Sequence, residues 1–186
     1  MHEHTTAHLV LLARHGDESA WRALVHRHAP AVWSVARSFR LAEADAADVC
    51  QATWLAFAEH LHRVREPERI AGWLITTARR ESLRLVRVRG REEPIDLWHP
   101  AGTGPGPEDV VLGDALATAL WRAFAELSEQ CQRVLRLVAC APELTYAQVA
   151  EALGLRVGSV GPTRSRCVER LRRRAVSAGL VSGVTR

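Results

Sequence analysis

The stretch LTYAQVAEALGLRVGSVGPTRSRCVERLRRR, residues 144–174, has the pattern of two helices joined by a tight turn. Thr145 is a suitable N-cap, and residues 146–153 place their apolar side chains on one helical face. Gly154 follows directly, and a glycine can adopt the positive φ that ends a helix. The pattern therefore predicts a first helix over residues 146–153 with an abrupt end at Gly154.

A second helix is expected after a turn of residues 155–158. We expect Ser159 to cap it, which would place Pro162 in the first turn, where a missing N–H has little cost. Apolar residues then recur at three- and four-residue spacing and predict one buried seam: Val160, Cys167, Val168 and Leu171. Two such helices joined by a glycine turn form the helix-turn-helix of many DNA-binding proteins.

The remaining face of this second helix is strongly basic. Residues 156–174 contain seven arginines and a single acid, Glu169. Arginines near the N-terminal end of such a helix can contact base edges in the major groove, and those further along can neutralise phosphates. The stretch therefore favours DNA binding, with a solvated basic helix at the end of a domain as the alternative.

The composition indicates a charge pattern built from blocks. At 186 residues the chain has room for one large or two small domains, and its formal net charge is +4. All 25 basic residues are arginines, which suit bidentate contacts to phosphate and guanine. Residues 40–62 and 92–114 are acidic, whereas residues 63–91 carry nine arginines against three glutamates. This alternation predicts several separate contact surfaces rather than one uniformly cationic protein.

Four cysteines stand far apart, each within an apolar helical pattern: Cys50, Cys131, Cys140 and Cys167. We expect small buried side chains and neither a zinc site nor a redox pair, because no CxxC spacing occurs. The histidines near the N-terminus lack partners at ligand spacing, so no metal or cofactor is expected. Without a signal peptide or a long apolar run, the sequence predicts a cytoplasmic protein with no membrane insertion.

The rest of the chain predicts helices and no sheet, because no segment alternates convincingly between apolar and polar residues. Helices are expected to start at these points: near Leu9, after an Asp17 cap with Pro30 as a possible break, near Ala44, at Ile70, at Val110, and after a Ser128 cap at Glu129. Residues 62–68 are predicted to form a loop, and prolines and glycines exclude a continued helix in the acidic segment 90–108. The expected fold is all-α, with two small helical domains at 1–89 and 109–175, a linker at 90–108 and a short tail at 176–186.

Further motifs precede the helix-turn-helix in this order: GDESAWRALVHRH (16–28), DAADVCQATWLAF (45–57), WLITTARRESLRLVR (73–87) and LSEQCQRVLRL (127–137). Together they resemble the extracytoplasmic-function, or group IV, sigma factors of bacterial RNA polymerase. The first two resemble the opening half of sigma region two, and the third resembles its promoter-recognising end. The last motif and the helix-turn-helix resemble region four, so the resemblance covers nearly all of residues 9–174.

The resemblance implies three contact surfaces, one for core polymerase and two for promoter elements. The helix that would bind the largest polymerase subunit carries Asp45, Asp48, Gln51 and Trp54, and the first three are expected to share a broad exposed face. The surface implied for the −10 element comprises Val64, Arg65 and Arg80, on the melted strand, and Arg79, Arg84 and Arg87, on phosphates. The surface implied for the −35 element comprises Ser159, Thr163, Arg164, Ser165, Arg166 and Arg170.

The sequence departs from the family at some of these positions. Arg80 and Arg84 stand where relatives often carry Asn and Asp, Glu169 stands where a basic residue is common, and Gly161-Pro162 replaces Gly-Thr. These departures imply a changed promoter preference. The acidic linker resembles the segment that threads toward the polymerase active centre and mimics nucleic acid, with a plain solvating linker as the alternative. An anti-sigma factor is a further partner that the family admits.

Two other classes of function compete with a sigma factor. A conventional helix-turn-helix regulator would bind a specific, symmetric DNA site without polymerase, whereas a sigma factor melts its promoter only in complex with core polymerase. An enzyme has little support, because no Ser/His/Asp grouping, glycine-rich phosphate loop or HExxH motif occurs. The expected function is therefore that of a non-catalytic sigma factor that directs core RNA polymerase to promoters and promotes DNA melting.

Overall fold

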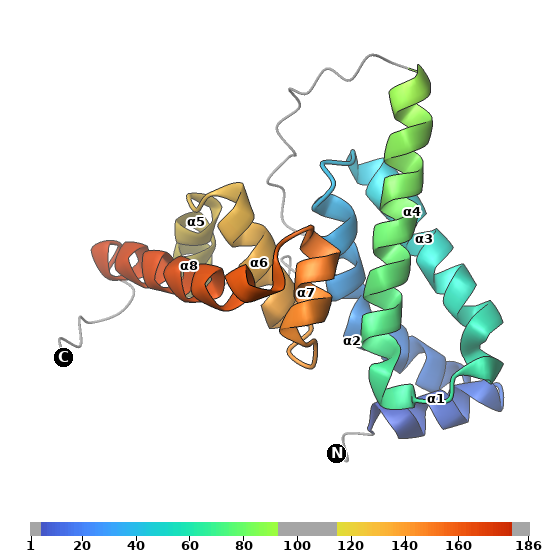
Figure 1. The fold of residues 1–186 in the computed structure, drawn as a ribbon. Coiled ribbons are helices and arrows are strands. Elements are labelled where there is room, and N and C mark those ends of the chain that lie inside the picture. Colours follow the sequence, from blue (N-terminus) through green and yellow to red (C-terminus); the bar gives the residue numbers. More distant parts are fainter. Residues whose placement is uncertain (1–4, 93–114, 180–186) are drawn as a thin grey trace.

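The computed structural model describes residues 5–92 and 115–179, and helices make up nearly all of both ranges (Figure 1). The helices are α1 (Thr6–Arg14), α2 (Glu18–Arg37), α3 (Glu43–His60), α4 (Ile70–Glu92), α5 (Ala115–Ala125), α6 (Glu129–Cys140), α7 (Tyr146–Leu153) and α8 (Val157–Ser177). Two short 3₁₀ turns, Leu61–Arg63 and Pro67–Arg69, connect α3 to α4. No strand occurs in the two described ranges, and the all-α prediction is confirmed.

The helices α1 to α4 pack into one bundle. The Asp17 carboxylate caps α2 as predicted, because it accepts hydrogen bonds from the N–H groups of Ser19 and Ala20 at 2.8 and 3.0 Å. Helix α2 continues through Pro30, so the possible break at this proline does not occur. Fully buried side chains of α2, α3 and α4 form the centre of the bundle: Leu24, Val32, Val35, Phe57 and Leu74.

The helix-turn-helix consists of α7 and α8, and its first helix has the predicted bounds. The Thr145 hydroxyl accepts from the N–H of Gln148 at 3.3 Å, and the Gln148 side chain accepts from the N–H of Thr145 at 2.9 Å. This reciprocal capping box satisfies two amides that a helix start leaves unpaired. Gly154 ends α7 with a φ of +66°, in the left-handed region that favours glycine. Both predictions, the cap and the stop, are confirmed.

The second helix of this motif starts earlier than predicted. Helix α8 begins at Val157, and Ser159 lies inside it with its hydroxyl donating to the Arg156 carbonyl at 2.7 Å. The predicted cap at Ser159 is therefore wrong, because the backbone already turns into the helix after Arg156. Pro162 consequently lies in the helix interior, where it removes one backbone hydrogen bond, rather than in the first turn.

Other boundaries differ by a few residues. Helix α4 continues to Glu92 and so includes the first residues of the segment predicted to be linker. The remainder of that linker and the expected helix start at Val110 lie outside the described residues. Ser128 is the N-cap of α6 as predicted, but its side chain makes no capping hydrogen bond. Helix α8 extends to Ser177, into the predicted tail.

The two groups of helices, α1–α4 and α5–α8, pack against each other through α2 with α6 and α4 with α7 (Figure 1). One hydrophobic cluster runs across this interface, with Val134, Leu137 and Val149 from the second group. The Gln148 side chain lies directly against Gly72 of α4, where a Cβ atom would collide with it. The helical halves therefore share part of their core.

A disulfide joins Cys131 of α6 to Cys167 of α8, 36 residues further along the chain. The expectation of no redox pair is wrong for these two cysteines, although both are small buried side chains as predicted. The spacing in sequence carries no signal for this pair. The packing of α6 on α8 brings their Cα atoms to 5.2 Å, which is within the range that a disulfide spans.

Candidate functional site

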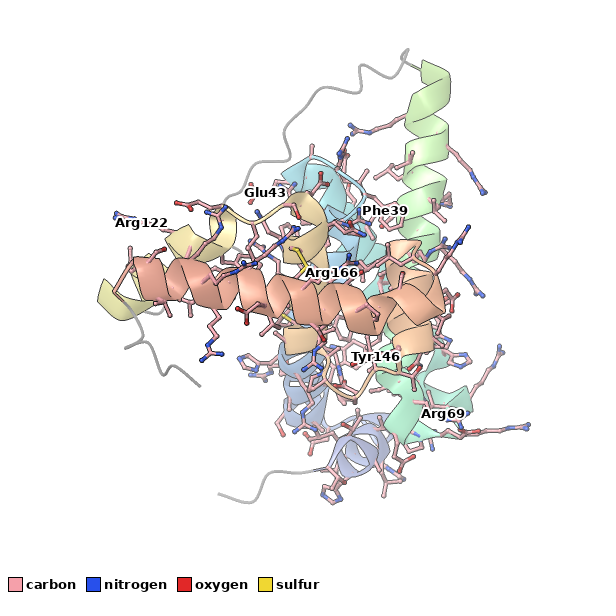
Figure 2. All side chains as sticks on the ribbon, turned by 60° about the vertical axis from the view of Figure 1, so that its left-hand side comes forward. Phe39, Glu43, Arg69, Arg122, Tyr146 and Arg166 are labelled. Atoms are coloured by element: carbon pink, nitrogen blue, oxygen red, sulfur yellow. A yellow bond between two sulfur atoms is a disulfide. The ribbon has the colours of Figure 1, made fainter. Side chains whose placement is uncertain are left out.

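The predicted −35 surface on α8 divides into exposed and inward-facing side chains. Arg164, Ser165, Arg166 and Arg170 are exposed. Thr163 is buried, and its hydroxyl accepts a hydrogen bond from Nη2 of Arg166 at 3.4 Å, so Thr163 does not lie on the outer face. Ser159 is half-buried and bonded to its own helix. The outer face of α8 thus presents guanidinium groups, among them that of Arg166 (Figure 2), beside one serine hydroxyl.

The neighbouring helix α7 helps to orient this surface. Arg164 donates from Nη1 to the Tyr146 hydroxyl at 3.4 Å, and Arg166 donates from Nε to the Pro162 carbonyl at 3.3 Å. Tyr146 is exposed at the start of α7 (Figure 2). The sequence alone does not mark Tyr146 as part of the site, because its contact with Arg164 depends on the angle between the two helices.

The predicted −10 arginines lie along α4. Arg80, Arg84 and Arg87 are exposed and follow one helical face at four- and three-residue spacing. Arg84 also pairs with Glu81 at 3.3 Å. Arg79 differs, because it is half-buried and its Nε is buried without a hydrogen-bond partner. The row of exposed arginines is suited to a phosphate backbone, and Arg79 stands apart from it.

A hollow of about 290 Å³ lies where the α3–α4 connection meets the start of α4. Its lining includes both predicted loop residues, Val64 and Arg65, together with His60 and Trp73. The His60 and Trp73 rings stack with centroids 5.0 Å apart and planes 5° from parallel. This stacked aromatic pair was not predicted, because His60 and Trp73 belong to different helices.

Helix α1 fixes the backbone beside this hollow. The Arg14 guanidinium donates from Nε to the Leu61 carbonyl at 3.0 Å and from Nη2 to the Val64 carbonyl. Two bonds from one rigid group hold both ends of the short connection. The loop residues Val64 and Arg65 are therefore positioned from outside the loop itself.

The predicted polymerase surface on α3 is only partly exposed. Asp48 and Gln51 are exposed, but Asp45 is only 3% exposed and forms an ion pair with Arg89 of α4. The prediction of an exposed Asp45 is wrong, because the first turn of α3 faces α4. Trp54 is half-buried and makes an edge contact with Trp21, with centroids 6.1 Å apart.

An apolar residue completes the exposed face of α3. Leu55 is 62% exposed and lies seven residues after Asp48, so it shares a helical face with Asp48 and Gln51. Sequence periodicity does not single out Leu55, because it stands among other apolar residues, Trp54, Ala56 and Phe57. The exposed face of α3 therefore combines a carboxylate, an amide and a leucine.

Charged groups at the interface between the halves have shifted proton affinities. A hydrogen bond from Arg40 lowers the pKa of Glu129, and burial lowers the pKa of Arg133. Burial also lowers the pKa of His28, with a smaller raising effect from Glu143, whose Oε1 lies 3.6 Å from Nδ1 of His28. Nε2 of His28 is buried with no hydrogen-bond partner.

In the part of the chain that the structure describes, no group of three or more His, Cys, Asp or Glu side chains could hold a metal ion. Across residues 5–92 and 115–179, none of the helices combines the length and apolar character that a bilayer crossing requires.

Comparison with known proteins assigns the chain to a family. The model of the Sigma-70 region 2 family matches residues 24–92, from within α2 to the end of α4. The chain is 32% identical over 167 residues to the ECF RNA polymerase sigma factor RpoE of Cereibacter sphaeroides. The matched region covers 85% of this chain and 87% of that protein. The chain belongs to the ECF sigma factors. It therefore directs RNA polymerase to promoters, as the sequence predicted, and belongs to a family that is generally not enzymatic.

Other similarities to this ECF sigma factor are more distant. It is 28% identical to the ECF RNA polymerase sigma factor SigE of Mycolicibacterium smegmatis over 153 residues. The matched region covers 78% of this chain but only 58% of that relative. Its fold resembles that of the sigma factor RpoE from Bartonella quintana, solved in complex with the anti-sigma factor NepR. That match has a TM-score of 0.56 at 22% identity, over 83% of this chain and 96% of the other, and concerns the fold alone.

Proposed function

We propose that this ECF sigma factor binds core polymerase through α3, the −10 element through α4 and its preceding loop, and the −35 element through α8. The main support is the position of the hollow between α3 and α4. Val64 and Arg65 line it, and the exposed arginines Arg80, Arg84 and Arg87 follow on the same helix. A pocket for a base next to a cationic track is what binding of a melted strand requires.

The −10 site would act by accepting a base that has left the duplex. Unstacking and unpairing a base costs roughly a few kcal/mol, which contacts in a pocket must offset. The stacked rings of His60 and Trp73 supply aromatic surface in the lining, and Arg65 supplies hydrogen-bond donors there. Arg80, Arg84 and Arg87 would neutralise phosphates of the strand, whereas Arg79 would act mainly within the protein because it is half-buried.

The −35 site would be the outer face of α8 in the major groove. Arg164 and Arg166 are the side chains that we assign to base edges, with Ser165 and Arg170 on the backbone of the DNA. A bidentate contact from Arg to guanine contributes about 1–3 kcal/mol of discrimination. Thr163 and Ser159 would support this surface from inside, since Thr163 bonds to Arg166 and Ser159 to the helix start.

The polymerase contact would use Asp48, Gln51 and Leu55, with Trp54 at its edge. A carboxylate suits a basic helical partner, and an exposed leucine adds apolar area. Asp45 would contribute indirectly, because its ion pair with Arg89 holds α3 against α4.

The two halves, 1–89 and 109–175, would act as separate units and part before they bind a promoter. Elements centred at −10 and −35 lie roughly 25 base pairs, or about 80 Å, apart along duplex DNA. In the structure α7 packs directly on α4. The packed arrangement is therefore incompatible with simultaneous contact to both elements.

The remaining assignments follow from this role. We propose that the chain works without catalytic chemistry and acts with RNA polymerase in the cytoplasm. An anti-sigma factor is a proposed partner, supported by the Bartonella quintana relative, which was solved with NepR. Such a partner would hold the sigma factor away from polymerase.

Run-off transcription with purified core polymerase on genomic fragments tests the proposal. The full chain should produce discrete transcripts, and Asp48→Arg should abolish them by weakening assembly with core polymerase. Glu43→Arg is the matched control, because it reverses an exposed charge on the same helix away from the face of Asp48. Specific DNA binding by the chain alone, with no effect of polymerase, would favour a conventional regulator and overturn the proposal.

A further inference from the structure

The disulfide between Cys131 and Cys167 fastens the promoter-binding helix α8 to α6. The bridge joins two residues that lie 36 positions apart in the sequence, and it spans all of α7 and the turn into α8. Figure 2 shows the yellow bond between these two helices. Cys167 follows Arg166 directly, so the cross-link lies immediately behind the surface that we assign to the −35 element.

Apolar packing gives this part of α8 little other support. A small cluster, separate from the main core, contains four buried residues: Phe124, Leu127, Cys131 and Cys167. Two of these four are the bridged cysteines, and among the side chains that the structure describes Leu135 and Leu171 add partly buried area. Beyond Val160, the other buried residues of α8 are Thr163 and Ala175. The cross-link is therefore a large share of what holds α8 to α6.

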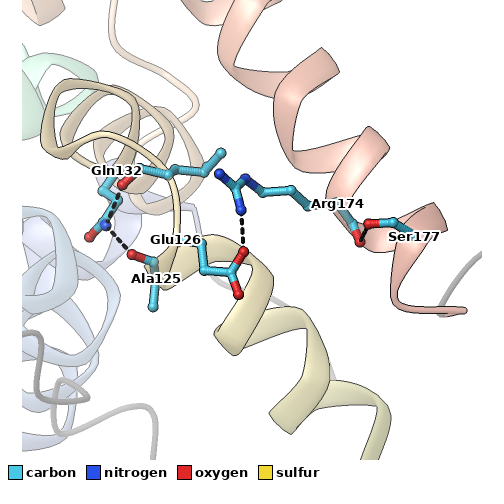
Figure 3. Close-up of polar contacts among 6 residues, drawn as sticks. Ala125, Glu126, Gln132, Arg174 and Ser177 are labelled. Carbon is cyan, nitrogen blue, oxygen red and sulfur yellow. Dashed lines mark hydrogen bonds and ion pairs between the residues drawn. The ribbon is translucent and has the colours of Figure 1, made fainter.

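Ionic contacts do not replace the bridge. The end of α8 is rich in arginine, and Arg170, Arg173 and Arg174 line a hollow beside Glu126 and Ser128. Arg174 donates to Glu126 at the end of α5, as Figure 3 shows. Exposed ion pairs of this kind contribute little stability, and the adjacent arginines repel one another.

Resting on the proposed function, we propose that Cys131 and Cys167 form a thiol–disulfide switch that controls recognition of the −35 element. The bridged form holds α8 in the binding geometry. The reduced form frees α8 from α6, so that only a fraction of molecules is competent to bind. A disulfide in a protein that works with cytoplasmic RNA polymerase is expected to exchange, because that compartment reduces permanent bridges.

Both directions of the switch are thiol–disulfide exchange reactions, with a small-molecule disulfide as the oxidant and a dithiol as the reductant. On oxidation the two cysteine thiols together release two protons and two electrons and form the bridge. A small-molecule disulfide accepts these protons and electrons and becomes two thiols. On reduction a dithiol attacks one sulfur of the bridge and forms a mixed disulfide. The second thiol of the reductant then releases that sulfur, so the reductant becomes a disulfide and both cysteines become thiols.

Exchange would begin at Cys131. This residue is 4% exposed and lies in the first turn of α6, where the N-cap Ser128 makes no side-chain hydrogen bond and so leaves the turn without a side-chain cap. The Gln132 amide restrains that corner by donating to the Ala125 and Leu127 carbonyls at 2.9 Å each, the first of which appears in Figure 3. Cys167 lies in the middle of α8 and is 1% exposed, so a reductant reaches it second.

The experiment compares the oxidised and dithiothreitol-reduced full chain, with thiols counted by alkylation and mass. Each form is assembled with core polymerase and used on a promoter fragment obtained in the run-off assay. Reduction should lower transcription about tenfold with no loss of assembly, since the competent fraction falls. Re-oxidation with glutathione disulfide should restore transcription. Gln132→Ala should accelerate reduction of the bridge.

Variants separate the bridge from other thiols. Cys131→Ser and Cys167→Ser should stay at the reduced level in both conditions, whereas Cys50→Ser and Cys140→Ser should respond like the wild type. Equal transcription from both forms, with reduction verified by mass, would overturn the switch and leave the sigma-factor role intact. An absence of transcripts from both forms would overturn the proposed function and the switch with it.

Discussion

Arg40, directly beyond α2, donates two hydrogen bonds to the carboxylate of Glu129, the first residue of α6, with Nε–Oε1 and Nη2–Oε2 distances of 3.2 and 2.9 Å. The residues lie 89 positions apart and join the two helical halves. Arg40 is also the one non-glycine residue with positive φ among those that the structure describes, at 59°. Two nitrogens of the guanidinium engage both carboxylate oxygens, and this bidentate geometry sets the pair apart from single exposed ion pairs, so it is well placed to act as a latch between the halves.

Breaking this ion pair should favour separation of the halves. We expect Arg40→Glu to increase the radius of gyration measured by small-angle X-ray scattering, because two carboxylates would then face each other. The double variant Arg40→Glu/Glu129→Arg should restore the compact form, as a double-mutant cycle requires for a direct pair. If the single and double variants scatter alike, the pair does not hold the halves together.

Gly72→Ala should destabilise the packing of α7 on α4. The added Cβ would displace the end of the Gln148 side chain and so disrupt the capping box with Thr145, at a cost of about 1 kcal/mol in the free energy of unfolding relative to Gly158→Ala, in which alanine has the same advantage in helix propensity. Chemical denaturation measures this loss. In a Gln148→Ala background the same substitution should have little further effect. Gly158→Ala is the control, because a Cβ there meets no atom within 4 Å.

Arg164→Ala should change promoter preference at the −35 element. Loss of a bidentate contact should reduce discrimination at one base pair by about 1–3 kcal/mol in binding assays of the assembled polymerase. Arg173→Ala, seven residues beyond Arg166 and on the same helical face as that residue, should weaken binding to all sequences alike, as expected of a phosphate contact. Unchanged preference in Arg164→Ala would remove this residue from the base-contacting set.

Acidification should loosen the interface at His28. Burial lowers the pKa of this histidine below 6.5, so the folded state keeps it neutral while the unfolded state binds a proton as pH falls. The contribution of neutral His28 to the free energy of unfolding is therefore complete above about pH 7 and declines as pH falls below about 6.5. Glu143 partly opposes this loss, and Arg27 adds to it. Thermal melts of the wild type should show this decline. His28→Gln should flatten the profile, and His62→Gln, an exposed site, should leave it unchanged.

Local features were predictable from sequence because their causes lie within a few residues. The Thr145 capping box and the left-handed Gly154 both depend on neighbours in the same turn. The start of α8 was not predicted, because the Ser159 hydroxyl bonds back to Arg156 and a proline is tolerated within the helix. Periodicity correctly placed Asp45 in a helix, but it did not predict that the side chain is buried.

The amino-acid sequence by itself determined the helices, their order and the family, since capping, apolar spacing and motif order are properties of the chain alone. Only the tertiary structure decided which of those residues meet. Arg89 buries Asp45 from 44 residues away, and Cys167 reaches Cys131 across 36. His60 and Trp73 stack only because α3 and α4 pack side by side. Such contacts depend on the packing of whole helices, and no short stretch of sequence encodes that packing.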